Sequence, residues 1–208
     1  MKIVIIGSGK HAHQVLDILK SCDYEFLGFV DEFDKNNCLG GFDIIEDIIK
    51  QHTDVKFFIG IGESKYRRES YSRISKNALY CNIIHPSSII SKNSYLGIGN
   101  LISPNVVINN NCKIGDFCIL NTSAIIEHDC NVGSFANINP RATICGSCSI
   151  GNSTTIGAGS TIIENKKIGN NSVIGAGSII VNNIEDNTLN YGVPSKKIKK
   201  INDDFIIY

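Results

Sequence analysis

The chain carries an aliphatic residue at every sixth position from Ile84 to Ile180 without a miss. So long a run in one register indicates a repeat rather than chance. A period of six fits neither a helix nor a simple strand, whose side chains repeat every ~3.6 and ~2 residues. It is typical of a parallel β-helix, in which each hexapeptide supplies one short strand. The aliphatic positions are Ile84, Ile90, Leu96, Ile102, Ile108, Ile114, Leu120, Ile126, Val132, Ile138, Ile144, Ile150, Ile156, Ile162, Ile168, Ile174 and Ile180.

Two other positions of the hexad support this interpretation against an ordinary β-sandwich with irregular strands. The residue after the aliphatic one is often glycine, which we expect to form tight corners. The residue four after it is mostly small and shares the inward face with the next aliphatic residue. Lys166 occupies this small position once and predicts a local bulge. The glycines are Gly97, Gly115, Gly133, Gly151, Gly157, Gly169 and Gly175, and the small residues include Cys112, Cys118, Cys130 and Cys148.

Residues 1–83 follow a different pattern. Short apolar runs over 2–6, 25–30 and 55–61 predict strands. Apolar residues at helical spacing predict helices over 11–20 and 42–51, and the charged segment 64–76 predicts a third helix. A strand, a glycine turn, a helix and a second strand closed by acidic residues form a small nucleotide-binding α/β pattern of the Rossmann type. We therefore predict two domains, a Rossmann-like domain over 1–83 and a β-helix with a C-terminal tail over 84–208.

The glycine turn of the first domain favours a phosphate site. Its backbone N–H groups and the following helix N-terminus both attract anions, although a tight turn without a ligand is the alternative. Ligands of such folds bind beyond the carboxyl ends of the strands. The predicted crevice therefore contains Gly7, Ser8, Gly9, Lys10, His11, Asp31, Glu32, Gly60 and Gly62, with Arg67 and Arg68 close enough to reach it.

Composition narrows the function. The chain has 20 basic residues (Lys and Arg) and 20 acidic residues (Asp and Glu), so its charges balance. Nucleic acid is therefore not an expected partner. The apolar run at the start of the chain is too short for a signal peptide or a membrane span. We therefore expect a cytoplasmic protein with no membrane partner. The cysteines inside the repeat are interpreted as reduced core thiols, including the single Cys-x-x-Cys spacing of Cys145 and Cys148.

His128 is the one histidine well inside the repeat. An imidazole titrates near pH ~6.5 and is the usual general base at neutral pH. Asp129 or Glu127 beside it would fix its tautomer, so His128 is a candidate base; a solvated surface histidine is the alternative. A metal site would need ligands that converge from adjacent coils. The positions eighteen residues before and after His128 are Asn110 and Gly146, which are not usual metal ligands. No metal is expected.

Several segments give the chain a family resemblance. They are IIGSGKHA at 5–12, FVDE at 29–32, IGIG at 59–62, HPSS at 85–88, NTSAIIEHDC at 121–130, IGAGS at 174–178 and YGVPSKKI at 191–198. On these segments the chain resembles the sialic acid O-acetyltransferase and UDP-N-acetylbacillosamine-type sugar N-acetyltransferase family. The resemblance implies a left-handed β-helix built of hexapeptide repeats.

The resemblance also implies how the site works. It implies a homotrimer with acetyl-CoA lying between subunits and a nucleotide-linked amino sugar held by the first domain. His128 would be the general base, Asp129 would orient it, Asn121 would lie near the acceptor, and the Gly146 N–H would face the thioester oxygen. No covalent enzyme intermediate is implied. The residues expected along the coenzyme are Asn137, Gly146, Ala176, Asn182, Pro194 and Lys196.

Three residues depart from the family pattern. Asn137 stands where many relatives have a histidine, and Asn182 where a lysine is usual. Lys10 replaces a glycine of the usual Gly-Gly-His turn, either to contact a phosphate or to point into water.

These features predict an acetyl-CoA-dependent N-acetyltransferase acting on a nucleotide-linked 4-amino-4,6-dideoxy sugar for surface polysaccharide biosynthesis, such as O-antigen or lipopolysaccharide. Two alternatives stay open. One is an O-acetyltransferase of sialic acid or a related sugar, and the other is a β-helix that binds nucleotide without catalysis.

Overall fold

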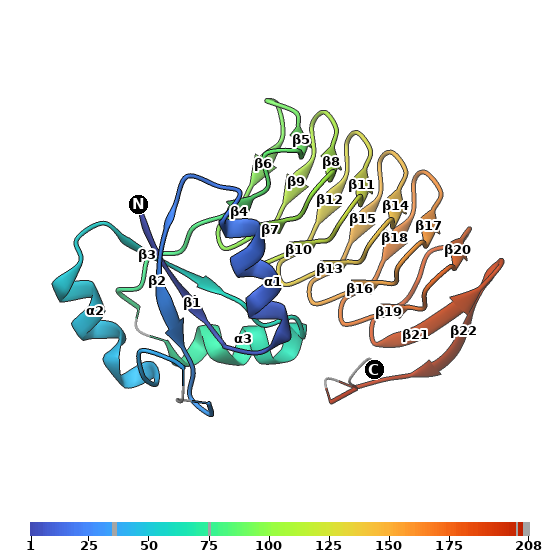
Figure 1. Ribbon diagram of the computed structural model, residues 1–208. Coiled ribbons are helices and arrows are strands. Elements are labelled where there is room, and N and C mark those ends of the chain that lie inside the picture. The colour runs from blue at the N-terminus through green and yellow to red at the C-terminus, as the bar shows by residue number, and fades with distance from the viewer. Residues whose placement is uncertain (35–36, 75, 203, 206–208) are drawn as a thin grey trace. The chain divides into compact units, whose positions relative to one another are not determined.

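The computed structural model describes residues 1–34, 37–74, 76–202 and 204–205. The chain divides into two compact units, Met1–Pro86 and Ser87–Tyr208 (Figure 1). The boundary expected after residue 83 lies just inside the first unit.

The N-terminal unit is a small α/β domain, which confirms the predicted class. Its sheet is parallel with the order β2-β1-β3, and the central strand is almost fully buried because Ile3, Val4, Ile5 and Ile6 all face packed helices or strands. The elements are β1 (Lys2–Ile6), α1 (Lys10–Leu19), β2 (Glu25–Val30), the 3₁₀ turn η1 (Phe42–Ile44), α2 (Ile45–Gln51), β3 (Val55–Ile59), α3 (Ser64–Arg73) and β4 (Ile83–Ile84).

The C-terminal unit is a left-handed parallel β-helix, as predicted. Two-residue strands follow one another around three parallel sheets (Figure 1). We name the sheets after one strand each: the β10 sheet runs β21-β19-β16-β13-β10-β7, the β11 sheet runs β20-β17-β14-β11-β8-β5, and the β12 sheet runs β18-β15-β12-β9-β6. The strands are β5 (Ile89–Ile90), β6 (Tyr95–Leu96), β7 (Leu101–Ile102), β8 (Val107–Ile108), β9 (Lys113–Ile114), β10 (Ile119–Leu120), β11 (Ile125–Ile126), β12 (Asn131–Val132), β13 (Asn137–Ile138), β14 (Thr143–Ile144), β15 (Ser149–Ile150), β16 (Thr155–Ile156), β17 (Thr161–Ile162), β18 (Lys167–Ile168), β19 (Val173–Ile174) and β20 (Ile179–Ile180).

An antiparallel hairpin ends the β-helix. It consists of β21 (Thr188–Gly192), which pairs parallel with β19, and β22 (Ser195–Lys200). No helix among the described residues is long and apolar enough to cross a membrane.

The small inward residues are hydrogen-bond donors as well as fillers. The Sγ atoms of Cys112, Cys118, Cys130 and Cys148 lie 3.0, 3.1, 3.2 and 3.1 Å from backbone carbonyl oxygens fifteen residues on. Where the chain has Thr154 instead, its hydroxyl makes the equivalent bond at 2.6 Å. The thiols therefore satisfy carbonyls at the corners of the following coil, which a purely apolar residue would leave without this donor.

The glycines at the corners of the β-helix are required for a different reason from the one expected. From Gly99 to Gly177 the left-handed backbone conformation falls two residues later in each hexad, on residues such as Asn111, Asp129 and Ser147. Gly115 and Gly133 are needed because the next coil approaches closely: a Cβ on Gly133 would lie 2.7 Å from the backbone nitrogen of Asn152. These glycines therefore allow close stacking of coils rather than a positive φ.

Lys166 does not distort the helix, and the predicted bulge is wrong. Its carbonyl accepts a hydrogen bond from the Ser149 N–H at 2.9 Å, and β18 pairs with β15 in unbroken register. The backbone ladder fixes the coil here, because its bonds do not depend on the side chain in the inward position.

Candidate functional site

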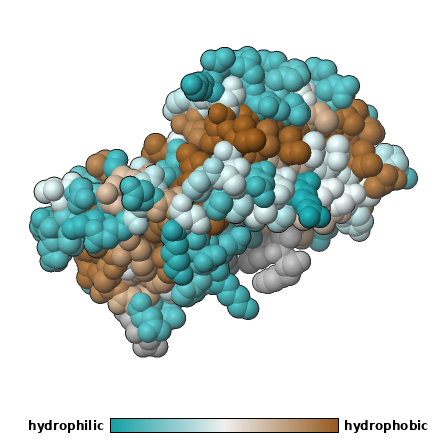
Figure 2. Space-filling view, turned by 45° about the horizontal axis from the view of Figure 1, so that its top comes forward, coloured by the Kyte–Doolittle hydropathy of each residue, from teal (hydrophilic) through white to brown (hydrophobic). Residues whose placement is uncertain are grey.

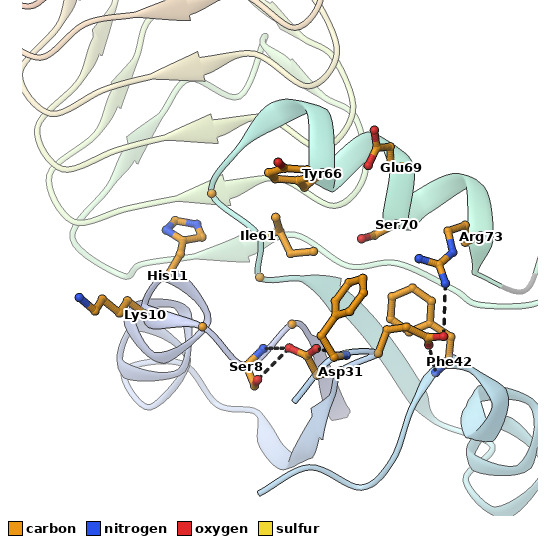
Figure 3. Close-up of a pocket in the computed structure, with 16 residues that line it drawn as sticks. Ser8, Lys10, His11, Asp31, Phe42, Ile61, Tyr66, Glu69, Ser70 and Arg73 are labelled. Atoms are coloured by element: carbon orange, nitrogen blue, oxygen red, sulfur yellow. Dashed lines mark hydrogen bonds and ion pairs between the residues drawn. The ribbon is translucent and has the colours of Figure 1, made fainter. Parts of the chain in front are cut away.

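A pocket of about 520 Å³ lies in the N-terminal unit, at the carboxyl ends of the parallel strands (Figure 3). It brings together the predicted crevice residues from Gly7 to His11 with Asp31, Glu32, Gly60 and Gly62, but neither Arg67 nor Arg68 is in its lining. Its lining consists of Gly7, Ser8, Gly9, Lys10, His11, Asp31, Glu32, Phe33, Phe42, Gly60, Ile61, Gly62, Tyr66, Glu69, Ser70 and Arg73.

One end of this pocket is built to receive an anion. Gly9 is the N-cap of α1 and no side chain caps it, while the first turn of the helix holds no acidic residue. The first N–H groups of a helix have no intrahelical acceptor and carry partial positive charge. Lys10 and His11 lie at the same end (Figure 3), so this end suits a phosphate.

The Asp31 carboxylate connects the glycine turn to the loop after β2 by hydrogen bonds. Its Oδ2 accepts hydrogen bonds from the Ser8 N–H at 2.7 Å and the Ser8 hydroxyl at 2.8 Å, and its Oδ1 accepts from the Phe33 N–H at 2.9 Å. Burial raises the pKa of Asp31, but the hydrogen bonds from Phe33, Ser8 and Asp34 outweigh it and the pKa is lowered. The carboxylate is therefore ionised and shapes both walls of the pocket.

His11 is held neutral. Burial, with a smaller effect of the Arg67 charge, lowers the pKa of His11 to about 4. Its Nε2 atom is buried without a hydrogen-bond partner among the described residues. A ligand phosphate beside this ring would supply both a partner and a negative charge that favours the protonated form.

Arg67 does not reach the pocket, which corrects the sequence-based expectation. Its side chain is 1% exposed, and its Nη1 donates to the Ile61 and Gly62 carbonyls at 2.8 Å each. It therefore shapes the loop after β3. Arg73, which the sequence did not single out, lines the pocket instead: it pairs with Glu32 at 3.3 Å and lies over the Phe42 ring at 5.3 Å.

The second candidate centre lies at a corner of the β-helix, between β11 and β12. The His128 Nδ1 is 2.8 Å from Asp129 Oδ2, and the other oxygen of Asp129 accepts from Asn111 at 2.6 Å. The His128 side chain is 60% exposed. The hydrogen bond to Asp129 is the largest cause that raises the pKa of His128.

Gly146 forms the floor beneath this imidazole. A Cβ at Gly146 would lie 2.7 Å from Cε1 and 2.8 Å from Nε2 of His128. The ring therefore lies against the backbone of the next coil, and any side chain there would displace it. No hydrogen-bond partner of the Gly146 N–H is found within the described part of the chain.

The other predicted residues fall on different edges of the β-helix. Gly146 lies one coil after His128 and Asn182 three coils after it, so these three share the edge between the β11 and β12 sheets. Asn121 and Ala176 lie on the edge between the β10 and β11 sheets, where Asn121 binds the Thr122 N–H at 2.8 Å. The remaining residues are Asn137, 8% exposed on β13, and the exposed Pro194 and Lys196 of the hairpin.

Comparison with known proteins matches both halves of the chain. Residues 2–74 match the PglD N-terminal domain family. The structure is similar to PerB from Caulobacter crescentus in complex with CoA and GDP-perosamine, with 29% identity, 96% of this chain and 98% of that chain covered, and a TM-score of 0.88. A mutant of perosamine N-acetyltransferase from the same organism gives 28% identity, the same coverage and a TM-score of 0.90.

More distant structures share the fold. The acetyltransferase domain of PglB from Neisseria gonorrhoeae in complex with acetyl coenzyme A is 23% identical, with 95% of this chain and 98% of that chain covered and a TM-score of 0.86. No curated protein matches the chain. The resemblance seen in the sequence is thus confirmed: residues 2–74 match the PglD N-terminal domain family, and the whole chain is similar in structure to sugar acetyltransferases with a left-handed β-helix.

Proposed function

We propose that this protein transfers the acetyl group of acetyl-CoA to the amine of a nucleotide-linked amino sugar, with His128 as general base. The observation that carries the role of His128 is its geometry: an exposed imidazole whose Nδ1 is held by Asp129 at 2.8 Å. With Nδ1–H donating to the carboxylate, the Nε2 lone pair is free to accept a proton.

The reaction is a direct transfer. The sugar nitrogen attacks the thioester carbonyl, a C–N bond forms and the C–S bond breaks. His128 takes the proton that the nitrogen loses and returns it to the departing thiolate of CoA. The Gly146 N–H, on the neighbouring coil, is the donor we assign to the oxygen that becomes negative in the transition state.

The two substrates are bound by different parts of the chain. The anion end of the pocket in the N-terminal unit takes the pyrophosphate of the sugar nucleotide. The coenzyme follows the exposed residues Ala176, Asn182, Pro194 and Lys196, and the ammonium of Lys196 pairs with a phosphate. Two similar structures with 28–29% identity contain CoA and GDP-perosamine, an amino sugar nucleotide, which supports this pairing of ligands.

A homotrimer explains why the site residues lie on two edges. His128 and Asn121 flank the β11 sheet on opposite sides, so one subunit cannot bring both to one reacting centre. The outward side chains of this sheet are apolar or threonine, and a hydrophobic band crosses the β-helix in Figure 2. Packing these faces around a threefold axis would place His128 of one subunit beside the Asn121 edge of the next. The outward residues are Ile89, Val107, Ile125, Thr143, Thr161 and Ile179.

We place the reaction in the cytoplasm and its product in surface polysaccharide biosynthesis. All eight cysteines are free thiols, as in proteins of a reducing compartment.

The acceptor decides between N- and O-acetylation. Purified protein with acetyl-CoA should release thiol with a nucleotide-linked 4-amino-4,6-dideoxy sugar, and the product should carry one acetyl group on the amine by mass spectrometry and NMR. Turnover with sialic acid but not with the amino sugar would favour O-acetylation. No thiol release with either acceptor would leave only a nucleotide-binding role.

A further inference from the structure

Planar side chains form the end of the nucleotide pocket away from Lys10 and His11 (Figure 3). The Arg73 guanidinium lies over the Phe42 ring, and Arg73 also pairs with Glu32. Phe33, which follows Glu32, lines the pocket while 90% exposed. Exposed aromatic rings and guanidinium planes stack well on nucleobases, so this end suits the base and the α1 end suits the phosphates.

The carboxylates of Glu32 and Glu69 lie near these planar groups, and only Glu32 is engaged by close bonds within the protein. Glu32 accepts the Phe42 N–H at 3.1 Å and pairs with Arg73 at 3.3 Å. Glu69, one turn before Arg73 on α3, has Lys65 as its charged neighbour at the much longer distance of 4.0 Å, and its side chain is 52% exposed. Glu69 therefore has acceptor capacity left for a ligand in the pocket.

An ionised carboxylate accepts hydrogen bonds and donates none. Guanine offers it two adjacent donors, N1–H and the 2-amino group. Uracil and thymine offer one N–H between two carbonyl oxygens, which a carboxylate repels, and adenine and cytosine place a ring-nitrogen acceptor beside their amino group. We infer that Glu69 binds the N1–H and 2-amino edge of guanine, so that the substrate is a GDP-linked amino sugar; this inference rests on the proposed function.

Isothermal titration calorimetry with GDP, IDP and UDP tests the inference, because IDP differs from GDP only in lacking the 2-amino group. We expect wild-type protein to bind GDP at least about tenfold more tightly than IDP or UDP, the order of discrimination that a bidentate contact provides. Glu69→Gln keeps the shape of the side chain but replaces one acceptor with a donor. It should bring the GDP-to-IDP affinity ratio close to one while UDP binding holds or rises.

Glu25→Gln is the matched control, since Glu25 is exposed at the start of β2 and does not line the pocket. It removes the same charge and should leave all three affinities unchanged. Equal or tighter binding of UDP by wild-type protein would overturn the guanine assignment, while acetyl transfer to another nucleotide-linked amino sugar would leave the proposed function standing. A GDP-to-IDP ratio that persists in Glu69→Gln would overturn the role of Glu69, and retained UDP binding shows that the variant pocket is intact.

Discussion

At the scale of single residues, the candidate base depends on three neighbours with separate tasks. Asp129 fixes the Nδ1 side of His128, Asn111 fixes Asp129, and Gly146 leaves room for the ring. The sequence suggested the adjacent carboxylate because it follows the histidine directly. The eighteen-residue repeat also placed Gly146 one coil from His128, but the bond between Asn111 and Asp129 was not predicted, because it joins side chains of two different coils.

Asp129→Asn should alter the pH dependence of acetyl transfer. The pKa of His128 is raised chiefly by its hydrogen bond to Asp129, and a base acts only after it loses its proton, so activity rises as the pH climbs through this pKa. An amide in place of the carboxylate lowers the pKa, so the acid limb of kcat/KM should move to lower pH while the plateau falls at least about tenfold. An unchanged acid limb would argue against His128 as the titrating base.

Gly146→Ala and Gly133→Ala form an informative pair. Both would place a Cβ within 3 Å of other atoms, but Gly146 meets the His128 ring whereas Gly133 meets backbone of the next coil. Gly146→Ala should turn the exposed ring aside and lower kcat at least about tenfold with little change in Tm. Gly133→Ala should lower Tm by several degrees, because backbone cannot yield as easily. The reverse result would show that the floor beneath His128 has no part in catalysis.

At the scale of elements, the β-helix could be predicted almost strand by strand. A strict hexad has few structural solutions, and the strands end on the predicted aliphatic residues. In the first unit β1 and β2 match the predicted limits, while α3 stops at Arg73, short of the expected residue 76. The positions of Arg67, Arg73 and Phe42 could not be predicted, since the helix period places residues on a face but does not say what that face meets.

The hydrogen bonds of the inward thiols predict a difference in stability between two similar variants of Cys118. Cys118→Ser keeps a donor for the Gly133 carbonyl, whereas Cys118→Ala removes it and leaves the coil otherwise alike. The serine variant should be more stable by about 1 kcal/mol, a typical net hydrogen-bond contribution. Matched thermal or urea unfolding curves would measure the gap. Equal stabilities would mean that the thiols only fill space.

At the scale of the whole molecule, the proposed mechanism requires the proposed homotrimer. Ile125→Glu places a charge on the outward face of the β11 sheet, where burial against another subunit would be costly. We expect light scattering to show loss of the trimer, with loss of acetyl transfer but retained nucleotide binding by the N-terminal pocket. Lys113→Glu, an exposed change on the β12 sheet, is the control and should stay trimeric and active. A fully active monomeric Ile125→Glu variant would contradict the shared site.

The turnover number of His128→Ala tests the central claim most directly. Release of CoA thiol in the presence of acetyl-CoA and the amino sugar nucleotide should fall about 10²- to 10⁴-fold, the usual contribution of a positioned base. His52→Ala, which removes a histidine outside the nucleotide pocket and the β-helix, should retain wild-type turnover. Near-wild-type turnover by a folded His128→Ala protein would contradict the mechanism.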